Sequence, residues 1–418
     1  MGVGEQPAGE LTKTRSGAVR KTQHPLRNRA FRLLWIGNTI SSTGDQFYLV
    51  ALPWLVLSLT GSSVVLGAIL MLAAIPRAVL MLIGGAVSDR ASPRRILMLT
   101  ALVRSLLVAA VAALLFLRDL RLWELYFLAL GFGVADAFSY PAGSAFLPSI
   151  VEPEQLPAAN SVSASTRQIT TLAAPGPAGL FIRAFGNAWA FLLDAISFFG
   201  IIAALIRLPD PPIPSTRGLQ GGMMRSIVDG LRYVRADVSL RSLMLVMAVL
   251  NFAIAGPMGI GLAVIAKHDF DTASAFGFLM SAFAGGSLTG MLGAGLVRHR
   301  RRGRTLLLAG AVIGLCVAPV GFLSRMTTLV PDLILMGGAA AFLNIQLISW
   351  FQQRVDRAVM GRVMSVLMFA AVGLLPFSLA VAGVALKASI TGTFLSAGAM
   401  ILLVILLAGS NRAVRAID

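Results

Sequence analysis

The chain has 418 residues, of which 57% are hydrophobic and 13% are charged, and its mean hydropathy is +0.82. Soluble globular proteins carry roughly 25% charged residues, so this composition excludes a soluble enzyme, a disordered regulator and a secreted disulfide scaffold. The formal net charge is +17, from 35 Lys and Arg against 18 Asp and Glu. We therefore expect a multi-span membrane protein whose basic excess faces anionic lipid headgroups and not nucleic acid.

Twelve apolar runs follow a polar, basic segment at residues 1–29, which lacks the apolar stretch of a secretory signal. Nearly all are long enough for a tilted helix to cross the hydrocarbon, and none alternates as a barrel strand would. The sequence therefore predicts an all-α membrane protein with twelve transmembrane helices. The predicted spans are 32–58, 63–87, 96–117, 122–146, 159–182, 187–207, 243–266, 274–297, 305–323, 330–352, 363–386 and 391–409.

A hydrophilic connector at 208–242 divides the spans six and six, into bundles at 30–207 and 243–409, with a C-terminal tail at 410–418. The connector opens with several prolines, which break helices. Residues 227–235 then show helical spacing with a basic face. This pattern is typical of an amphipathic helix at the membrane surface, although a solvated linker helix fits it equally well.

The distribution of Lys and Arg predicts that both termini are cytoplasmic. With that orientation the cytoplasmic segments hold 26 of the 35 basic residues, the external loops hold six, and three lie inside spans. This bias follows the positive-inside rule.

The loop between spans 2 and 3 carries a motif made of Gly85, Asp89, Arg90, Arg94 and Arg95. A weaker copy begins at Gly293, 208 residues later, which suggests two repeated halves. In a protein with six and six spans, this motif resembles the loop signature of the major facilitator superfamily, with Ser92 where the family has glycine.

The segment from Leu147 to Asn160, together with Gly361-Arg362 at the start of span 11, resembles the branch of bacterial siderophore and macrolide exporters. The resemblance implies two six-helix bundles that rock to give alternating access. It also implies that Asp89 lies near Gly361 and Arg362, where a charge-assisted contact would close the cytoplasmic side. Ordinary loop charge is the alternative reading of these residues.

Six ionisable residues lie inside first-half spans, where a charge is costly and functional by default. They are Asp45, Arg77, Arg104, Asp136, Arg167 and Asp194. One hypothesis is that they form buried pairs that hold the bundle together, and this fits Arg104 and Asp194 best. The other is that Asp45 and Asp136 carry protons, with Arg77 or Arg167 as the counter-charge. The arginine motif that proton-coupled exporters of the superfamily carry in span 4 is missing here.

Span 5 contains Pro175, Gly176, Pro177 and Gly179, which resemble the Gly-Pro-x-x-Gly motif of the superfamily's antiporters. A plain packing kink is the alternative. An exporter also needs a cavity for an amphipathic ligand. The candidate lining residues are Tyr48, Phe138, Tyr140, Asn251, Asn344 and Gln346.

No cofactor, metal site or enzymatic activity is expected. The single cysteine, Cys316, can neither pair within the chain nor build a metal site alone, and no hydrolase, metalloprotease or nucleotide-binding motif is present. The sequence predicts a monomeric exporter of small amphipathic molecules in the bacterial inner membrane, driven by proton antiport. A lipid flippase and an uptake symporter on the same fold are the alternatives.

Overall fold

The computed structural model describes residues 24–88, 91–210, 232–235, 237–296, 302–355, 360, 363, 366–367 and 373–415. Asp89, Arg90, Gly361 and Arg362 lie outside the described residues, so the predicted contact between the loop motif and span 11 stays a prediction. Most of the predicted amphipathic segment also lies outside. Its described part, residues 232–235, is helical, and Val234 is buried.

The described residues of the first half of the chain form seven α-helices. They are α1 (Arg29–Thr60), α2 (Ser63–Ser88), α3 (Pro93–Leu117), α4 (Leu122–Ile150), α5 (Leu156–Ala173), α6 (Pro175–Phe185) and α7 (Asn187–Arg207). Short 3-10 turns precede α1 at Pro25–Arg27 and α5 at Pro153–Gln155. Predicted span 5 is divided between α5 and α6 because Pro175 has no backbone N–H to continue the first helix.

The second half is built in the same way. Its helices are α9 (Val238–Ile265), α10 (Ala273–Leu296), α11 (Arg302–Val317), α12 (Met326–Arg354), α14 (Leu375–Ala388), α15 (Ile390–Ser410) and α16 (Arg412–Arg415). A π-turn at Ala266–Phe270 extends α9, and a 3-10 turn at Ala318–Phe322 extends α11. Helix α9 begins five residues before the predicted span because the Asp237 carboxylate caps it, accepting from Ser239 N and Leu240 N.

The all-helical membrane fold is confirmed. Within the described residues, nine helical segments are long and apolar enough to cross a bilayer. The remaining predicted spans correspond to α1, to α5 with α6, and to α14. Helix α1 carries a polar stretch from Asn38 to Gln46, the divided span is two shorter helices, and only the second part of span 11 is described. The number twelve stays a prediction.

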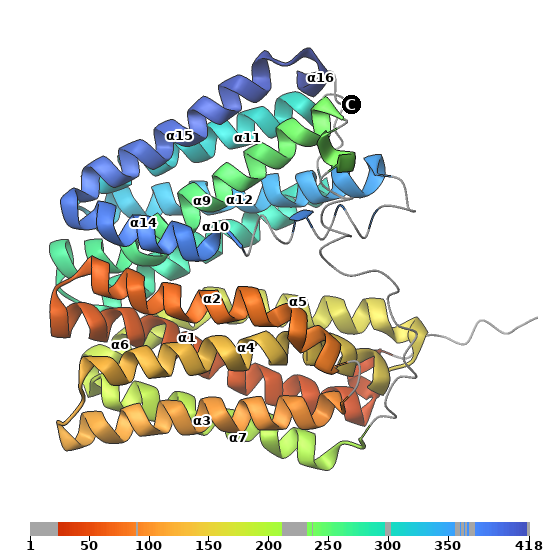
Figure 1. Ribbon diagram of the computed structural model, residues 1–418, viewed down its shortest axis with the longest axis vertical. Helices are drawn as coiled ribbons and strands as arrows, with labels where there is room; N and C mark the ends of the chain where they lie inside the picture. Colours follow the sequence, from red (N-terminus) through yellow and green to blue (C-terminus); the bar gives the residue numbers. More distant parts are fainter. Residues whose placement is uncertain are drawn as a thin grey trace, which may run out of the picture.

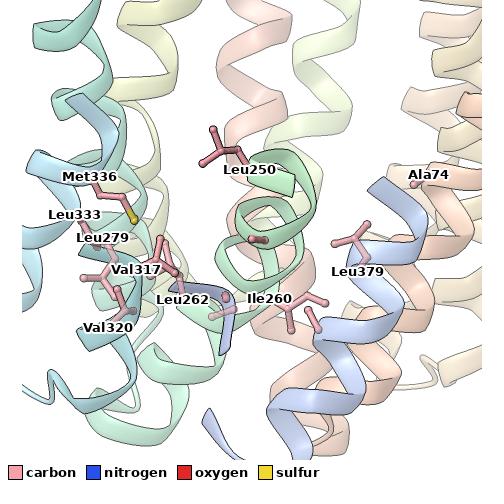
Figure 2. Packing of buried hydrophobic residues seen from close by; sticks show 14 of the residues in the cluster. Ala74, Leu250, Ile260, Leu262, Leu279, Val317, Val320, Leu333, Met336 and Leu379 are labelled. Carbon is pink, nitrogen blue, oxygen red and sulfur yellow. The ribbon is translucent and has the colours of Figure 1, made fainter. Parts of the chain in front are cut away.

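The helices form two groups, with α1–α7 in one and α9–α16 in the other (Figure 1). In the first group α2 and α5 lie on the side turned toward the second group, whereas α3 and α7 lie on the far side (Figure 1). The buried apolar cluster is continuous between the groups. It runs from Val317 and Leu333 past Ile260 of α9 to Leu379 of α14 and Ala74 of α2 (Figure 2).

Two seams join the bundles, and we name them by their helices. At the α2–α14 seam, Ser63 Oγ donates to Gly383 O over 2.8 Å, and a Cβ added at Gly67 would lie 2.9 Å from Leu379 O. At the α6–α10 seam, Gly176 N donates to Ser281 Oγ over 3.1 Å. Small residues let the backbones approach closely, and these contacts lie at the end predicted to be external.

Candidate functional site

Three of the predicted intramembrane charges meet inside the first bundle. The Arg104 guanidinium of α3 lies 2.6 Å from Asp45 Oδ1 of α1 and 3.5 Å from Asp136 Oδ1 of α4. The Arg104 side chain is 17% exposed, and those of Asp45 and Asp136 are 28% and 31% exposed. We refer to these residues as the arginine–aspartate triad. Arg104 is therefore the counter-charge of both acids, a role that the sequence analysis assigned to Arg77 or Arg167.

Aromatic rings fix the position of Arg104. Its guanidinium carbon lies 4.7 Å from the centre of the Phe132 ring and 4.8 Å from that of Phe198. The Tyr48 ring stacks on Phe132 with ring centres 4.4 Å apart. Cation–π contact holds a guanidinium most strongly where water is scarce, so the arginine has a defined orientation between the two carboxylates.

Asp194 of α7 is the most buried of the six charges, with no exposed surface. Its Oδ1 lies 3.4 Å from Ser197 Oγ, and its Oδ2 has no hydrogen-bond partner. It packs against Gly44 of α1, where an added Cβ would lie 2.0 Å from Ser197 Oγ. Glycine at this position therefore lets α7 bring Asp194 next to the triad.

The cluster formed by the triad and Asp194 holds more acid than base. If Asp45, Asp136 and Asp194 were all ionised, the single guanidinium of Arg104 would leave two negative charges uncompensated. An uncompensated charge at this depth costs several kcal/mol, on the order of 3. Binding a proton removes that cost, so the chemistry available to this cluster is reversible proton uptake.

Arg77 and Arg167 do not join the cluster. Arg77 on α2 is partly exposed and Arg167 on α5 is exposed. In the described part of the chain, neither guanidinium has an ion pair or a hydrogen bond. Pairing with an acid of the described residues therefore does not explain why these two arginines lie inside predicted spans.

The described residues of the loop motif contact the first bundle itself. Arg94 Nε donates to Leu205 O over 2.6 Å at the end of α7. Arg95 Nε lies 3.2 Å from Asp210 Oδ2, and Ser92 Oγ donates to Asp210 Oδ1. Ser92, which stands where the family has glycine, thus forms a hydrogen bond with the start of the connector. Gly85 lies in the last turn of α2, and an added Cβ there would meet nothing within 4 Å.

The proline–glycine motif of span 5 lies in the α6–α10 seam. An added Cβ at Gly179 would lie 2.4 Å from Ala273 O, and one at Gly277 would lie 2.1 Å from Pro175 O. The motif, which also includes Gly176 and Pro177, therefore combines a helix break with close contact between the two bundles.

The six predicted lining residues separate into two groups. Tyr140 of α4 is 68% exposed and Asn344 of α12 is exposed, so both can contact a ligand. Tyr48 is a core residue between Phe132 and Phe191. Phe138 is two residues from Asp136, so its side chain lies on nearly the opposite side of α4. Asn251 and Gln346 are held within their own bundle, because the Asn251 amide donates to Met247 O and the Gln346 amide donates to Ala294 O.

One half-buried acid, Asp332, was not among the residues predicted from the sequence. Asp332 lies near the start of α12, where its Oδ2 is buried without a hydrogen-bond partner and its carboxyl faces the Cys316 thiol. Asp332 lies at the edge of predicted span 10 and was therefore not counted among the intramembrane charges. An aspartate directly after Pro331 in an apolar run was the sequence signal that could have identified it.

A model of the family described as transmembrane secretion effector matches residues 21–418. The chain belongs to this branch of the major facilitator superfamily. The multidrug efflux pump Tap of Mycolicibacterium fortuitum is 30% identical to this secretion effector over 296 residues, covering 68% of this chain and 71% of Tap. The enterobactin exporter EntS of Shigella boydii is 24% identical over 336 residues, covering 80% of each chain.

Solved structures share the fold of this secretion effector. The nucleoside transporter NupG superposes with a TM-score of 0.73 at 11% identity, over 93% of this chain and 100% of NupG. A bacterial homologue of the iron transporter ferroportin, in an inward-facing state, superposes with a TM-score of 0.70 at 17% identity, over 92% and 99% of the chains. The protein is therefore a multi-pass membrane transporter and not an enzyme.

Proposed function

We propose that this transporter exports small amphipathic molecules from the bacterial cytoplasm in exchange for protons. The observation that carries the proposal is that one guanidinium, Arg104, is shared by two partly exposed carboxylates, Asp45 and Asp136. The direction of transport is supported by the relatives, which are named as a multidrug efflux pump and an enterobactin exporter.

Sharing of Arg104 supplies a way to bind and release a proton. When both carboxylates are ionised, the guanidinium can compensate only one of them fully. A proton arriving on one of the two carboxylates would free Arg104 to bind the other alone, and its departure would restore the shared state. Because Arg104 lies on α3 and the acids lie on α1 and α4, each protonation step changes how three helices attract one another.

The two seams support alternating access. Contacts at Ser63–Gly383 and Gly176–Ser281 are hydrogen bonds between small residues, which separate at little cost. They join the bundles at the end predicted to be external. Opening these seams while the opposite ends approach would expose the triad to the other side of the membrane.

The test is gradient-driven dye uptake into everted membrane vesicles, in which export appears as uptake. We expect an imposed pH gradient to accelerate uptake of 6-carboxyfluorescein by the wild type, and Asp45→Asn or Asp136→Asn to lose that acceleration. Asp119→Asn, a control at an exposed carboxylate that is 69% exposed, should retain it. Equal acceleration in all four proteins would contradict proton coupling, and dye movement in the opposite direction would favour uptake.

A further inference from the structure

The direction of Arg77 follows from the faces of α2. Ile75, Val79 and Ile83 are exposed and spaced by four residues, so they form the lipid-facing stripe. Arg77 lies two residues from Ile75 and from Val79, about 160° away around the helix. It therefore points away from lipid.

Two other contacts define the sector in which Arg77 lies. Gly67 faces α14 in the opposite bundle, and Gly84 faces the backbone of Ala137 on α4. At about 100° of rotation per residue, Arg77 falls between these two directions. The side chain is thus directed between α4 of its own bundle and α14 of the second bundle, which is the inner side of α2.

Arg167 takes the corresponding position on α5. The preceding Thr166 accepts from Trp35 Nε1 of α1 over 2.8 Å, and the following Gln168 donates to Ala284 O of α10 over 3.4 Å. Ile169, which is exposed, marks the lipid side about 160° away from Arg167. Arg167 therefore faces inward between α1 and the opposite bundle.

Among the described residues, the helices that meet α2 and α5 across the two seams place no acid opposite these arginines. Helix α10, which packs against α5 and α6, contains no Asp or Glu, and neither does predicted span 11 at 363–386, which includes α14. Within the first bundle, Asp45 and Asp136 lie against Arg104 and not against either of these arginines. Arg77 and Arg167 are therefore two cations near mid-membrane that no carboxylate of the described residues contacts.

Such charges are expensive and are retained where a ligand uses them. Guanidinium groups bind carboxylates, phenolates and phosphates through paired, charge-assisted hydrogen bonds. Tyr140, four residues after Asp136 on the same side of α4, is 68% exposed and offers an aromatic surface to a ligand. A molecule with an acidic group and an aromatic or apolar body would satisfy both features.

We infer that the transported substrate is a soluble amphipathic organic anion whose acidic group binds Arg77 or Arg167 on the inner face of the first bundle. The inference rests on the proposed transport function and adds to it the chemical class of the substrate. It also separates two roles among the intramembrane charges, with the triad handling protons and the two remaining arginines handling the substrate.

The experiment measures binding of 6-carboxyfluorescein, an anionic dye, to the purified full-length protein in neutral detergent by fluorescence anisotropy. We expect Arg77→Gln and Arg167→Gln each to raise the Kd about tenfold, which is the loss expected for one charge-assisted hydrogen bond. Arg77→Lys and Arg167→Lys should recover part of the affinity. Arg183→Gln removes an exposed arginine of α6 near its external end and should leave the Kd unchanged.

Two further measurements test which chemical class of ligand the arginines bind. Rhodamine 6G, a cationic dye on the same ring system, should bind no more weakly to Arg77→Gln and Arg167→Gln than to the wild type. 2-Naphthoate, an aromatic carboxylate that does not emit in the range of the dye, should displace the bound dye, whereas dihexanoylphosphatidylglycerol at the same concentration should not. Displacement by the phospholipid would assign the arginines to a lipid headgroup and overturn the inference, as would an unchanged Kd in both glutamine variants.

The binding assay needs no pH gradient, so its failure can be told apart from failure of the proposed function. Retained binding together with gradient-independent flux would remove proton coupling and leave the substrate class intact. Normal gradient-driven transport of rhodamine 6G together with no anion binding would leave proton coupling intact and overturn the inferred substrate class.

Discussion

Arg104 and Asp45 join α3 to α1 through a contact of 2.6 Å between guanidinium and carboxylate. Since Asp136 of α4 shares the same guanidinium, one side chain from an outer helix holds two inner helices together. The pairing makes Arg104 both a structural element of the first bundle and the counter-charge for each acid in turn.

Replacing Arg104 should therefore destabilise the first bundle more than replacing either acid. Arg104→Gln leaves carboxylates facing one another without compensation, and we expect a loss of about 3–5 kcal/mol. The measurement is unfolding in detergent followed by helical circular dichroism. Arg167→Gln, which breaks no pair, is the matched control, and equal unfolding midpoints for the two variants would contradict the account.

Restoring charge balance should rescue part of that loss. In Arg104→Gln combined with Asp45→Asn and Asp136→Asn, the uncompensated carboxylates of the triad are gone, so the unfolding midpoint should rise above that of Arg104→Gln alone. A triple variant no more stable than the single one would indicate that packing of Arg104 against Phe132 and Phe198, and not its charge, holds the helices.

Gly44 should tolerate no side chain. Its added Cβ would lie 2.0 Å from Ser197 Oγ and 2.8 Å from Asp194 Oδ1, so Gly44→Ala must push α7 away from α1. We expect a fall in stability of about 1–3 kcal/mol, measured by the same unfolding assay. Gly143→Ala, where no atom lies closer than 4.0 Å, should be neutral or stabilising, and adding Ser197→Gly to Gly44→Ala should recover part of the loss.

The α6–α10 seam should open in each transport cycle. A Cβ added at Gly176 lies 3.5 Å from Ser281 Oγ, close enough for Gly176→Cys and Ser281→Cys to form a disulfide. With Cys316 replaced by Ser, oxidation of this pair should stop dye transport, and dithiothreitol should restore it. The single variants serve as controls, and full transport by the oxidised pair would contradict opening at this seam.

The start of the connector should be insensitive to pH across the physiological range. The Ser92 hydroxyl, followed by Arg95, lowers the pKa of the exposed Asp210 carboxyl. A carboxylate with a lowered pKa in the folded state contributes stability above its unfolded pKa of about 3.9 and loses it only as pH falls below that value. Proteolysis of the 208–242 connector should therefore be equal at pH 8 and pH 5 in the wild type.

The contact between Asp210 and Arg95 also predicts what happens when the Asp210 carboxylate is replaced. Asp210→Asn should increase cleavage within the connector at both pH values, because the attraction to Arg95 is lost. Asp119→Asn, at an exposed carboxylate outside the connector, is the control. A wild-type connector that becomes protease-sensitive between pH 8 and pH 5 would show that another group secures it.

Much of this transporter could be predicted from hydropathy alone. Twenty or so apolar residues must cross a bilayer as a helix because the backbone has no other hydrogen-bond partner in lipid. The predicted spans and the division at 208–242 consequently needed no tertiary information. Where boundaries differed, a single side chain was responsible, as with Pro175 inside span 5 and the Asp237 cap before α9.

The pairing among the six charges could not be read in this way. Hydropathy places Arg77, Arg104 and Arg167 at similar depths, but it does not say toward which neighbour each guanidinium points. That depends on the rotation of α2, α3 and α5 about their axes and on which helices flank them. Only the tertiary structure joins Arg104 to Asp45 and Asp136 and, among the residues it describes, leaves Arg77 and Arg167 without an acid, because contact is a property of packed helices and not of one helix's own sequence.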